Sequence, residues 1–466
     1  MPLFLVLVFI GTFLSILNSS MVNVALPTLM NEFSIDIQSS TWLYSSYMLP
    51  YAIAMSIFGS LGDIYGAKGT FLVGVLIFAI GSLFCSIAGS FWFLLSSRII
   101  QALGAAAIMP NAMILAISPF EHSKRSEILG WWGMVSSAGS LVGPTLGGFL
   151  TEHFGWHSIF YVNLPFAAAI LILGIQYIPS AGKSKSAARF DYPGSIYLTF
   201  SLVALLFGIT LGPTVGWLSH KVLVLAGITL LFTWLLIKQE RIISHPLISL
   251  GLFKNLSFTA TVSVGFFQGA ALFGSMLLIP MYLQHVHDFS PTYAGVLVLP
   301  LSISMMVMSP IMGKISNKAG VRKLIVSGMA ILAVGIWLFS RLSIQSPYWI
   351  LATALIATGV GLGASSTPLT TNLINVVPQV QMGMASGLFN MTRYLGGVMG
   401  STILGAFMQQ REEFYLTQLM MNHYTVAIAE KIALEKAFSE VFVLAAGAAI
   451  IGMIAAFFTG TPRDKK

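Results

Sequence analysis

The chain has 466 residues, of which 56% are hydrophobic and 8% are charged, whereas soluble proteins carry about 25% charged residues. This composition cannot cover the surface of soluble domains, and it predicts an all-α integral membrane protein. The single cysteine, Cys85, excludes a disulfide framework and a cysteine-rich metal site.

Fourteen apolar runs are long enough to cross the hydrocarbon core of a membrane, which takes about 20 residues per helix. In chain order they cover residues 3–26, 43–62, 70–89, 92–118, 128–151, 158–178, 194–212, 222–237, 257–283, 293–313, 323–340, 347–371, 383–408 and 440–459. The first run lacks a basic leader and a small-residue cleavage site, so we expect a retained helix. The runs are continuous rather than alternating, which argues against a β-barrel.

The basic residues predict that both chain ends lie in the cytoplasm. With that orientation, 16 Lys and Arg fall on the inner side and 5 on the outer side, and Arg98 and Arg393 fall within spans. This is the bias that the positive-inside rule describes. The net charge of +8 therefore reflects topology, and we expect no nucleic-acid partner.

The two halves of the chain repeat one another. Residues 59–68 align with residues 313–322 at an offset of 254. Three glycines recur at an offset of 257, where Gly130, Gly139 and Gly143 pair with Gly387, Gly396 and Gly400. We expect an N-terminal six-helix bundle (1–180), an inserted two-helix segment with cytoplasmic linkers (181–256) and a C-terminal six-helix bundle (257–466). Two such bundles are typical of rocking transporters with a substrate site between them.

Four motifs carry a family resemblance: the loop at 59–68, Arg98-Ile-Ile-Gln101, the run at 139–148 and the segment Trp156–Pro165. With them the whole chain resembles a major facilitator superfamily transporter of the fourteen-span drug:proton antiporter branch (EmrB/QacA-like). The resemblance implies a monomeric secondary transporter in the lipid bilayer of the bacterial cytoplasmic membrane. It implies export of small amphipathic compounds, with protons as the default coupling ion. No cofactor, metal site or enzymatic activity is expected.

The loop at 59–68 is the candidate cytoplasmic gate, with Gly59, Asp63, Gly66 and Lys68 as its residues. The glycines permit a tight turn, and a carboxylate is attracted to the positive N-terminal end of a helix. The resemblance implies that Asp63 meets the start of the thirteenth span, around Gly383, and holds the inner side closed. The alternative is a solvated turn that carries one acidic residue.

The fifth span carries the candidate exporter motif, which consists of Gly139, Gly143, Pro144, Gly147 and Gly148. Small residues four positions apart let two helices approach closely, and a proline permits a local bend. In the resembling family this run marks exporters rather than importers. Ordinary tight packing is the alternative explanation.

Arg98, Gln101 and Arg393 are the candidates for substrate binding or coupling, because burying an arginine at the centre of a membrane helix costs about 2.5–3.5 kcal/mol or more. The alternative is an arginine held by backbone carbonyls. Relatives in the resembling family carry Asp where this chain has Asn18, and an amide cannot titrate. The remaining acids are expected at the rims, solvated by water. We therefore expect weak dependence on the pH gradient and a preference for neutral, zwitterionic or anionic substrates.

Other polar and aromatic side chains fall at depths where they can line a substrate cavity. Tyr44, Tyr47 and Tyr51 share one face of the second span. The full set of cavity candidates is Asn18, Asn23, Tyr44, Tyr47, Tyr51, Asn111, Trp132, Gln268 and Asn390. Packing or a membrane-interface position is the alternative for each.

Two rival functions remain open at this level. One is a facilitator or lipid-like flippase of the same fold without proton coupling. The other is a membrane enzyme or receptor, although the sequence has neither a phosphate-binding loop nor a cluster of catalytic residues.

Overall fold

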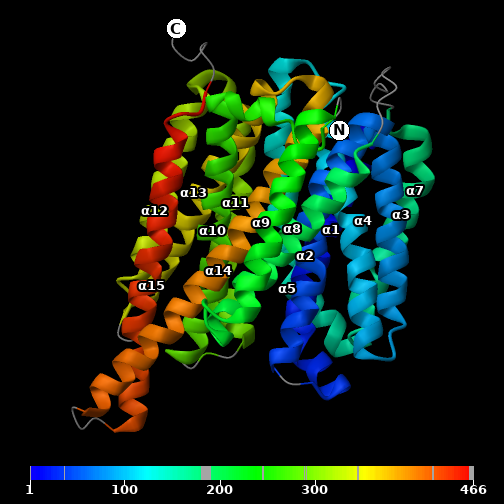
Figure 1. The fold of residues 1–466 in the computed structure, drawn as a ribbon. Coiled ribbons are helices and arrows are strands. Elements are labelled where there is room, and N and C mark those ends of the chain that lie inside the picture. Colours follow the sequence, from blue (N-terminus) through cyan, green and yellow to red (C-terminus); the bar gives the residue numbers. More distant parts are fainter. Residues whose placement is uncertain are drawn as a thin grey trace. The chain divides into compact units, whose positions relative to one another are not determined.

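The computed structural model describes residues 2–35, 37–179, 190–243, 246–287, 289, 291–343, 346–421 and 425–460. Over these ranges the chain is helical and contains no β-strand (Figure 1). It divides into two compact units. Unit 1 comprises Met1–Leu205, Gly227–Lys254 and Leu373–Met391, and unit 2 comprises Leu206–Ala226, Asn255–Asn372 and Thr392–Lys466.

The helices of unit 1 come mainly from the first part of the chain. They are α1 (Leu3–Phe33), α2 (Ile37–Tyr65), α3 (Ala67–Ser86), α4 (Phe91–Ile117), α5 (His122–Phe154), α6 (Ser158–Tyr161) and α7 (Asn163–Tyr177), with the short 3₁₀ helices η1 (Leu250–Lys254) and η2 (Gln379–Gln381). Within the unit, α3 packs on α4 and α7, α1 packs on α5, and α2 packs on α4.

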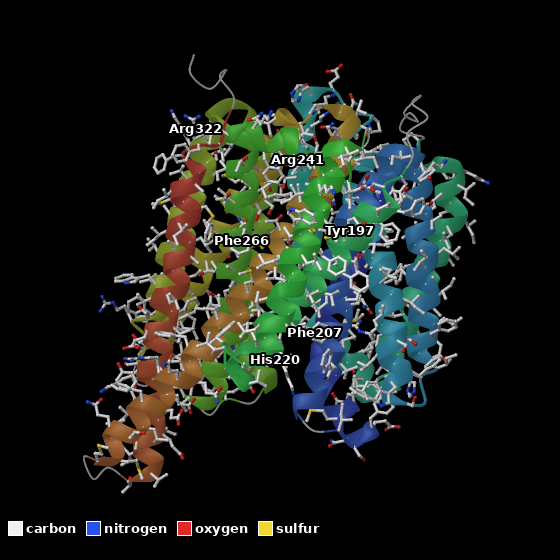
Figure 2. The ribbon with its side chains drawn as sticks, viewed as in Figure 1. Tyr197, Phe207, His220, Arg241, Phe266 and Arg322 are labelled. Carbon is white, nitrogen blue, oxygen red and sulfur yellow. The ribbon has the colours of Figure 1, made fainter. Side chains whose placement is uncertain are left out.

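Unit 2 contains α10 (Leu256–His285), α11 (Pro291–Ala319), α12 (Val321–Phe339) and α15 (Val426–Ala456). Helix α15 packs on α10 and on α12. Four further helices are divided between the units: α8 (Tyr192–Val215), α9 (His220–Ile242), α13 (Tyr348–Val376) and α14 (Met382–Met421). Figure 2 labels Arg322 on α12, whose Nε donates to the carbonyl oxygen of Thr459 after α15.

The predicted apolar runs all lie on helices, in agreement with the all-α membrane fold. Within the described ranges, eleven helical stretches are long and apolar enough to cross a membrane. The predicted runs 43–62, 128–151 and 383–408 lie on α2, α5 and α14, which are long but carry more glycine and polar residues. Large apolar side chains such as Trp92, Ile172 and Leu230 are exposed on their helices, as lipid-facing residues are.

Helices α14 and α15 continue beyond their apolar runs. Helix α14 has 40 residues, which at about 1.5 Å per residue is roughly 60 Å, twice the thickness of the hydrocarbon core. Helix α15 begins at Val426, well before the predicted run at 440–459. Arg411 and Tyr415 of α14 both donate to the carboxylate of Glu440 on α15, and this ion pair fastens the two extensions together.

Helix α3 approaches α4 through glycines that leave no room for a side chain. A Cβ atom at Gly81 would meet the backbone nitrogen of Gln101. A Cβ at Gly104 would meet the backbone of Phe78. Contacts of this kind bring two backbones together, and they explain why these helices need glycine at these positions.

The same contacts recur in unit 2 at the offsets seen in the sequence. Gly335 on α12 faces the backbone nitrogen of Thr358, and Gly361 on α13 faces the backbone of Leu332. Residues of α3 correspond to α12 at an offset of 254, and residues of α4 correspond to α13 at an offset of 257. The repeat found in the sequence is therefore confirmed as repeated helix packing. The domain boundaries at 180 and 256 remain a prediction.

Candidate functional site

The carboxylate of Asp63 accepts two backbone hydrogen bonds at the start of α14. Its Oδ1 accepts from the N–H of Gly383 at 2.8 Å, and its Oδ2 accepts from the N–H of Met384 at 2.8 Å. The first turn of a helix has unsatisfied N–H groups and a partial positive charge, so a carboxylate suits this place. The contact predicted from the sequence is present in the structure, and it lies entirely within unit 1.

Close approach of two backbones makes this contact possible. A Cβ at Gly59 would overlap the carbonyl oxygen of Gly383, and a Cβ at Gly387 would overlap the carbonyl oxygen of Met55. Gly66 follows α2 with a φ of 99°, a conformation that favours glycine, and turns the chain into α3. Lys68 then donates from Nζ to the carbonyl oxygen of Ile175 at 2.7 Å, which ties this turn to α7.

A second cluster, here called the Arg98 cage, lies buried inside unit 1. It consists of Asn18, Tyr47, Ser82, Arg98, Gln101 and Asn163, which come from α1, α2, α3, α4 and α7. The Asn18 and Gln101 amides form a reciprocal pair: Asn18 Nδ2 donates to Gln101 Oε1 at 2.9 Å, and Gln101 Nε2 donates to Asn18 Oδ1 at 3.2 Å. The structure thus brings together four predicted residues and two that were not predicted as site residues.

Arg98 is held by the Gln101 amide and lies against two aromatic rings, those of Tyr47 and, at 6.0 Å from its centroid, Phe160. Its Nη1 donates to Gln101 Oε1 at 2.9 Å, and its guanidinium carbon lies 4.3 Å from the centroid of the Tyr47 ring. The Tyr47 ring stacks in turn on Tyr51, with 5.5 Å between centroids. Arg98 is 1% exposed, so both contacts are shielded from water. Both contacts are with side chains, so they do not support the alternative explanation, in which backbone carbonyls hold the arginine.

The two residues missed as site residues complete the amide network. Asn163 Nδ2 donates to Asn18 Oδ1 at 3.2 Å, and Gln101 Nε2 also donates to the hydroxyl of Ser82 at 2.8 Å. Asn163 belongs to the Trp156–Pro165 motif, so the sequence offered a signal for it. Ser82 has no distinguishing sequence signal, because serine is common in membrane helices.

The glycines of the exporter motif line the face of α5 that packs on α1. A Cβ at Gly139 would lie 3.1 Å from the carbonyl oxygen of Phe13, and a Cβ at Gly147 would lie 2.9 Å from Cα of Met21. Gly143 faces Ser20 and the carbonyl oxygen of Leu17. Gly148 is half-buried, and Pro144 is exposed within the same helix.

Comparison with known proteins settles the family. The model of the Major Facilitator Superfamily matches residues 8–401, which is most of the chain. The chain belongs to the major facilitator superfamily.

Relatives of this transporter with known names support the same assignment. It is 33% identical over 410 residues to the multidrug resistance protein Stp of Mycobacterium tuberculosis (strain CDC 1551 / Oshkosh), covering 85% of this chain and 74% of that protein. It is 29% identical over 466 residues to the riboflavin transporter RibZ of Clostridioides difficile (strain 630), covering 99% of this chain and 98% of that one.

A solved structure shares the fold. The human organic anion transporter MFSD10 (TETRAN) superposes with a TM-score of 0.68 at 14% identity, over 98% of this chain and 100% of that one. Members of the superfamily are multi-pass membrane proteins that carry small molecules across a membrane. This protein is a transporter and not an enzyme.

Other predicted cavity residues of the transporter make separate contacts within unit 1. Asn111 Nδ2 donates to the carbonyl oxygens of Phe58 and Ala107, so it links α4 to α2. Trp132 Nε1 donates to Thr12 Oγ1 at 3.2 Å. Asn390 Nδ2 donates to the carbonyl oxygen of Ser386 at 2.9 Å. The side chains of Asn23 and Tyr44 lie outside the described residues.

Two predicted residues belong to unit 2. Gln268 is fully buried, and its Nε2 donates to the hydroxyl of Ser365 at 2.7 Å, joining α10 to α13. Arg393 lies on α14 and is half-buried. Its backbone carbonyl oxygen packs directly against Gly269, so that a Cβ atom at Gly269 would overlap it.

The expectation that all remaining acids are solvated is wrong for two residues of unit 1. Asp191 and Glu240 are 2% and 6% exposed. Asp191 Oδ1 accepts from the N–H of Gly194 at 2.9 Å and from Gln239 Nε2 at 3.0 Å. The burial of this carboxylate is explained by polar partners in the first turn of α8 and near the end of α9. A pattern of apolar runs does not predict such partners. Glu152 is exposed as expected, and Glu127 is half-buried.

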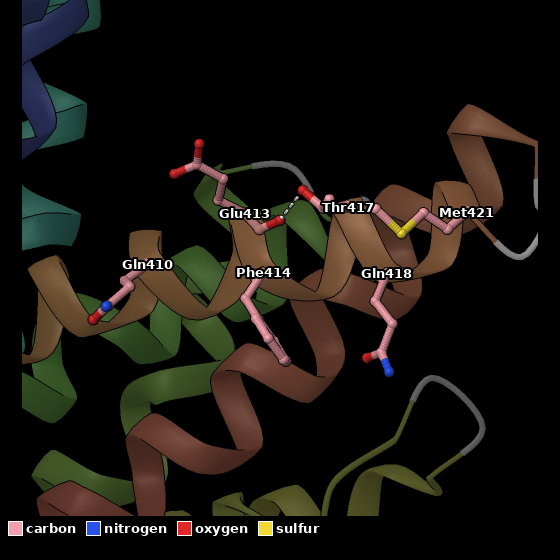
Figure 3. Close-up of a pocket in the computed structure, with 6 residues that line it drawn as sticks. All are labelled: Gln410, Glu413, Phe414, Thr417, Gln418 and Met421. Atoms are coloured by element: carbon pink, nitrogen blue, oxygen red, sulfur yellow. Dashed lines mark hydrogen bonds between the residues drawn. The ribbon is translucent and has the colours of Figure 1, made fainter.

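A shallow surface depression lies on the extension of α14 (Figure 3). It is lined by Gln410, Glu413, Phe414, Thr417, Gln418 and Met421. All six residues come from this helix, and Thr417 Oγ1 donates back to the carbonyl oxygen of Glu413 at 2.8 Å. None of the predicted site residues lines this depression.

Proposed function

We propose that this transporter exports small amphipathic compounds by alternating access, as a monomer in the bacterial cytoplasmic membrane. It would belong to the fourteen-span drug:proton antiporter branch, which the motifs resemble. The observation that carries the proposal is the contact between the Asp63 carboxylate and the first N–H groups of α14.

This contact has the properties that a reversible gate needs. Hydrogen bonds to a charged group contribute about 1.5–3 kcal/mol each, so two of them favour the closed arrangement by a few kcal/mol. A difference of that size can be offset by substrate binding, which leaves both states accessible. The glycine contacts at Gly59 and Gly387 let the helices meet without interlocked side chains, so they can separate again.

Two observations favour export over import. The α5 glycines pack on α1 at every fourth position, and in the resembling family this run is found in exporters. The relative Stp is named a multidrug resistance protein, and resistance is the consequence of moving a toxic compound outward. The name of RibZ, a riboflavin transporter, gives no direction.

The test is a resistance profile in a bacterial host that lacks its own efflux pumps. The host expresses the intact transporter or the Asp63→Asn variant at matched levels, and a panel of anionic, zwitterionic, neutral and cationic amphiphiles is assayed. Export predicts raised inhibitory concentrations for some compounds with the intact protein and a loss of that protection with the variant. Greater sensitivity to the compounds with the intact protein would indicate import and reject the proposal.

A second candidate function is a facilitator or lipid-like flippase of the same fold without proton coupling. It is favoured by the Arg98 cage, in which an asparagine occupies the position where the resembling family carries a titratable aspartate. Purified protein in liposomes separates the two functions. Uphill transport driven by an imposed pH gradient supports antiport, whereas transport that only equilibrates the compound supports the facilitator.

A further inference from the structure

Arg98 is a buried cation for which the described part of the chain supplies no carboxylate partner. The ion pair found in the structure joins Arg411 to Glu440, in the other unit. The polar contacts of Arg98 are neutral: the Gln101 amide and the face of the Tyr47 ring. A buried cation is stabilised best by an anion, so the cage lacks the group that would balance it.

The repeat shows that the fold itself does not need this cage. At the offsets fixed by the glycine contacts, Arg98 corresponds to Leu355 and Gln101 to Thr358. Asn18 corresponds to Ala271, because Gly139 faces Phe13 as Gly396 faces Phe266 (labelled in Figure 2). The remaining equivalents are Leu301 for Tyr47 and Ile336 for Ser82. All five equivalents are buried in unit 2. A well-packed bundle is therefore built there without a charge.

Two atoms of the cage are left without a partner. Arg98 Nε and Asn163 Oδ1 are both buried and make no hydrogen bond to any residue that the structure describes. Buried polar atoms normally find partners, and an unpartnered guanidinium N–H is a donor for an anionic oxygen. Asn163 Oδ1 is an acceptor that a hydroxyl group of the same compound would satisfy.

We propose that the Arg98 cage binds the carboxylate of the transported compound, so that amphipathic carboxylates are the substrates that this site selects. The assignment rests on the proposed function, because a transporter exposes its buried site during each cycle. The carboxylate accepts from Arg98 Nε and takes over the position that the electron-rich Tyr47 ring holds when no substrate is bound.

The helix that covers Arg98 is also the gate helix. Tyr47 and Asp63 both lie on α2, about 24 Å apart along the axis at 1.5 Å per residue. Tyr47 is fixed through its hydroxyl, which donates to the carbonyl oxygen of Ser15 at 3.1 Å. Movement of α2 uncovers Arg98 when the Asp63 contact opens, and binding of the carboxylate favours the arrangement in which α2 has moved.

The experiment measures binding to the purified full-length protein in nanodiscs by isothermal titration calorimetry. The probes are 2-naphthoate and 2-naphthamide, which have the same ring system and differ in charge. We expect naphthoate to bind about tenfold tighter or more, as a hydrogen bond to a buried charge predicts. In Arg98→Leu, which copies the residue of the other repeat, the two probes should bind equally.

Three controls make the result decisive. Arg341→Leu removes an exposed arginine that also stacks on an aromatic ring, at 4.8 Å from Trp337, and should keep the naphthoate preference. Arg98→Lys keeps the charge and should keep part of the preference, which covers the case in which Arg98→Leu does not fold. Chloride is titrated alone and in competition with naphthoate, to distinguish a substrate carboxylate from an inorganic anion.

Equal binding of the two probes to the intact protein overturns the proposal, as does a naphthoate preference that survives in a folded Arg98→Leu variant. Absence of naphthoate binding also overturns it, and chloride binding in that case assigns the cage to an inorganic anion instead. These results measure binding and not transport. The proposed export function is therefore still supported if the proposal of a carboxylate site is rejected. Greater sensitivity to the compounds with the intact protein in the resistance profile, together with a retained naphthoate preference, would reject export alone.

Discussion

Asp63 is a residue whose partner is a helix end rather than another side chain. Each carboxylate oxygen accepts from a backbone N–H of α14, so an amide at this position would turn one N–H group toward another. Asp63→Asn should therefore lower transport about tenfold, in line with the loss of a charged hydrogen bond, while the melting temperature hardly changes. Initial export rates and thermal unfolding of the purified variant check this.

The matched control for Asp63 is Glu152→Gln, which neutralises an exposed acid at the end of α5. It should transport like the intact protein. Full activity of Asp63→Asn would remove the gate hypothesis, and a large drop in its melting temperature would assign Asp63 to folding instead.

Asn18 occupies a place that would accommodate a carboxylate only in part. Its Oδ1 accepts from Gln101 Nε2 and from Asn163 Nδ2, so aspartate would keep both acceptor contacts and gain the charge of nearby Arg98. Aspartate would lose the hydrogen bond that Asn18 Nδ2 donates to Gln101 Oε1, so the Gln101 amide would have to turn. Asn18→Asp should make export depend on the pH gradient, or abolish transport if the charge is trapped against Arg98. Transport in proteoliposomes with and without a pH gradient gives the answer.

Asn18→Ala is the control, since alanine stands at the equivalent position of the other repeat. It should leave the pH dependence as it is. An Asn18→Asp variant that transports normally with unchanged pH dependence would show that position 18 plays no part in coupling.

At the scale of the helices, glycines determine how closely neighbours pack. Gly81 on α3 and Gly335 on α12 each face a backbone nitrogen across the interface, of Gln101 and Thr358 respectively. A methyl group at either position forces the helices apart, and we expect Gly81→Ala and Gly335→Ala each to cost about 1–3 kcal/mol of stability. Thermal unfolding of the purified variants measures the loss.

Gly69→Ala is the matched control, because no heavy atom lies within 4 Å of a Cβ built there. It should be neutral or slightly stabilising, since alanine is the better helix former by about 1 kcal/mol. If Gly81→Ala destabilised the protein and Gly335→Ala did not, the packing of the two repeats would not be equivalent in solution.

For the whole molecule, the basic residues predict fourteen spans with both ends inside. The sole native cysteine, Cys85, is fully buried and should not react, so single cysteines can be added directly. A cysteine at Ser219, in the loop between α8 and α9, should be labelled from outside intact cells. A cysteine at Ser184, outside the described residues, should be labelled only after the cells are opened. Labelling of position 184 from outside would reject the topology.

Coupling is also a property of the whole molecule. The Arg98 cage contains amides, a serine, a tyrosine and an arginine, and its six residues include neither a carboxylate nor a histidine. Export should therefore persist when the pH gradient across proteoliposomes is dissipated. Collapse of export would mean that another group carries the proton, and Asp191 and Glu240 would then be neutralised first because they are buried. Glu127, which is half-buried, would follow.

The sequence by itself determined the all-α membrane fold and the repeat. Long apolar runs must form helices in lipid, where every backbone group needs an internal partner. The nearly constant offset between the halves then predicted repeated packing, which depends on local composition and spacing. The contact of Asp63 with the start of α14 was implied by the resemblance of the motif at 59–68 to the family, and the structure contains that contact.

Only the tertiary structure decided which polar residues share one site. Asn18, Arg98 and Asn163 come from three different helices, and a periodic pattern cannot tell whether a polar residue faces a partner or a neighbouring backbone. In the sequence, Asn111 and Trp132 were cavity candidates just as Asn18 was. In the structure they form hydrogen bonds outside the Arg98 cage, to Phe58 and Thr12 respectively. The burial of Asp191 could not be predicted from the sequence either, because its partner Gln239 lies 48 residues further along the chain, on α9. The rotation of each helix about its axis is fixed by packing between helices, which no single helix encodes.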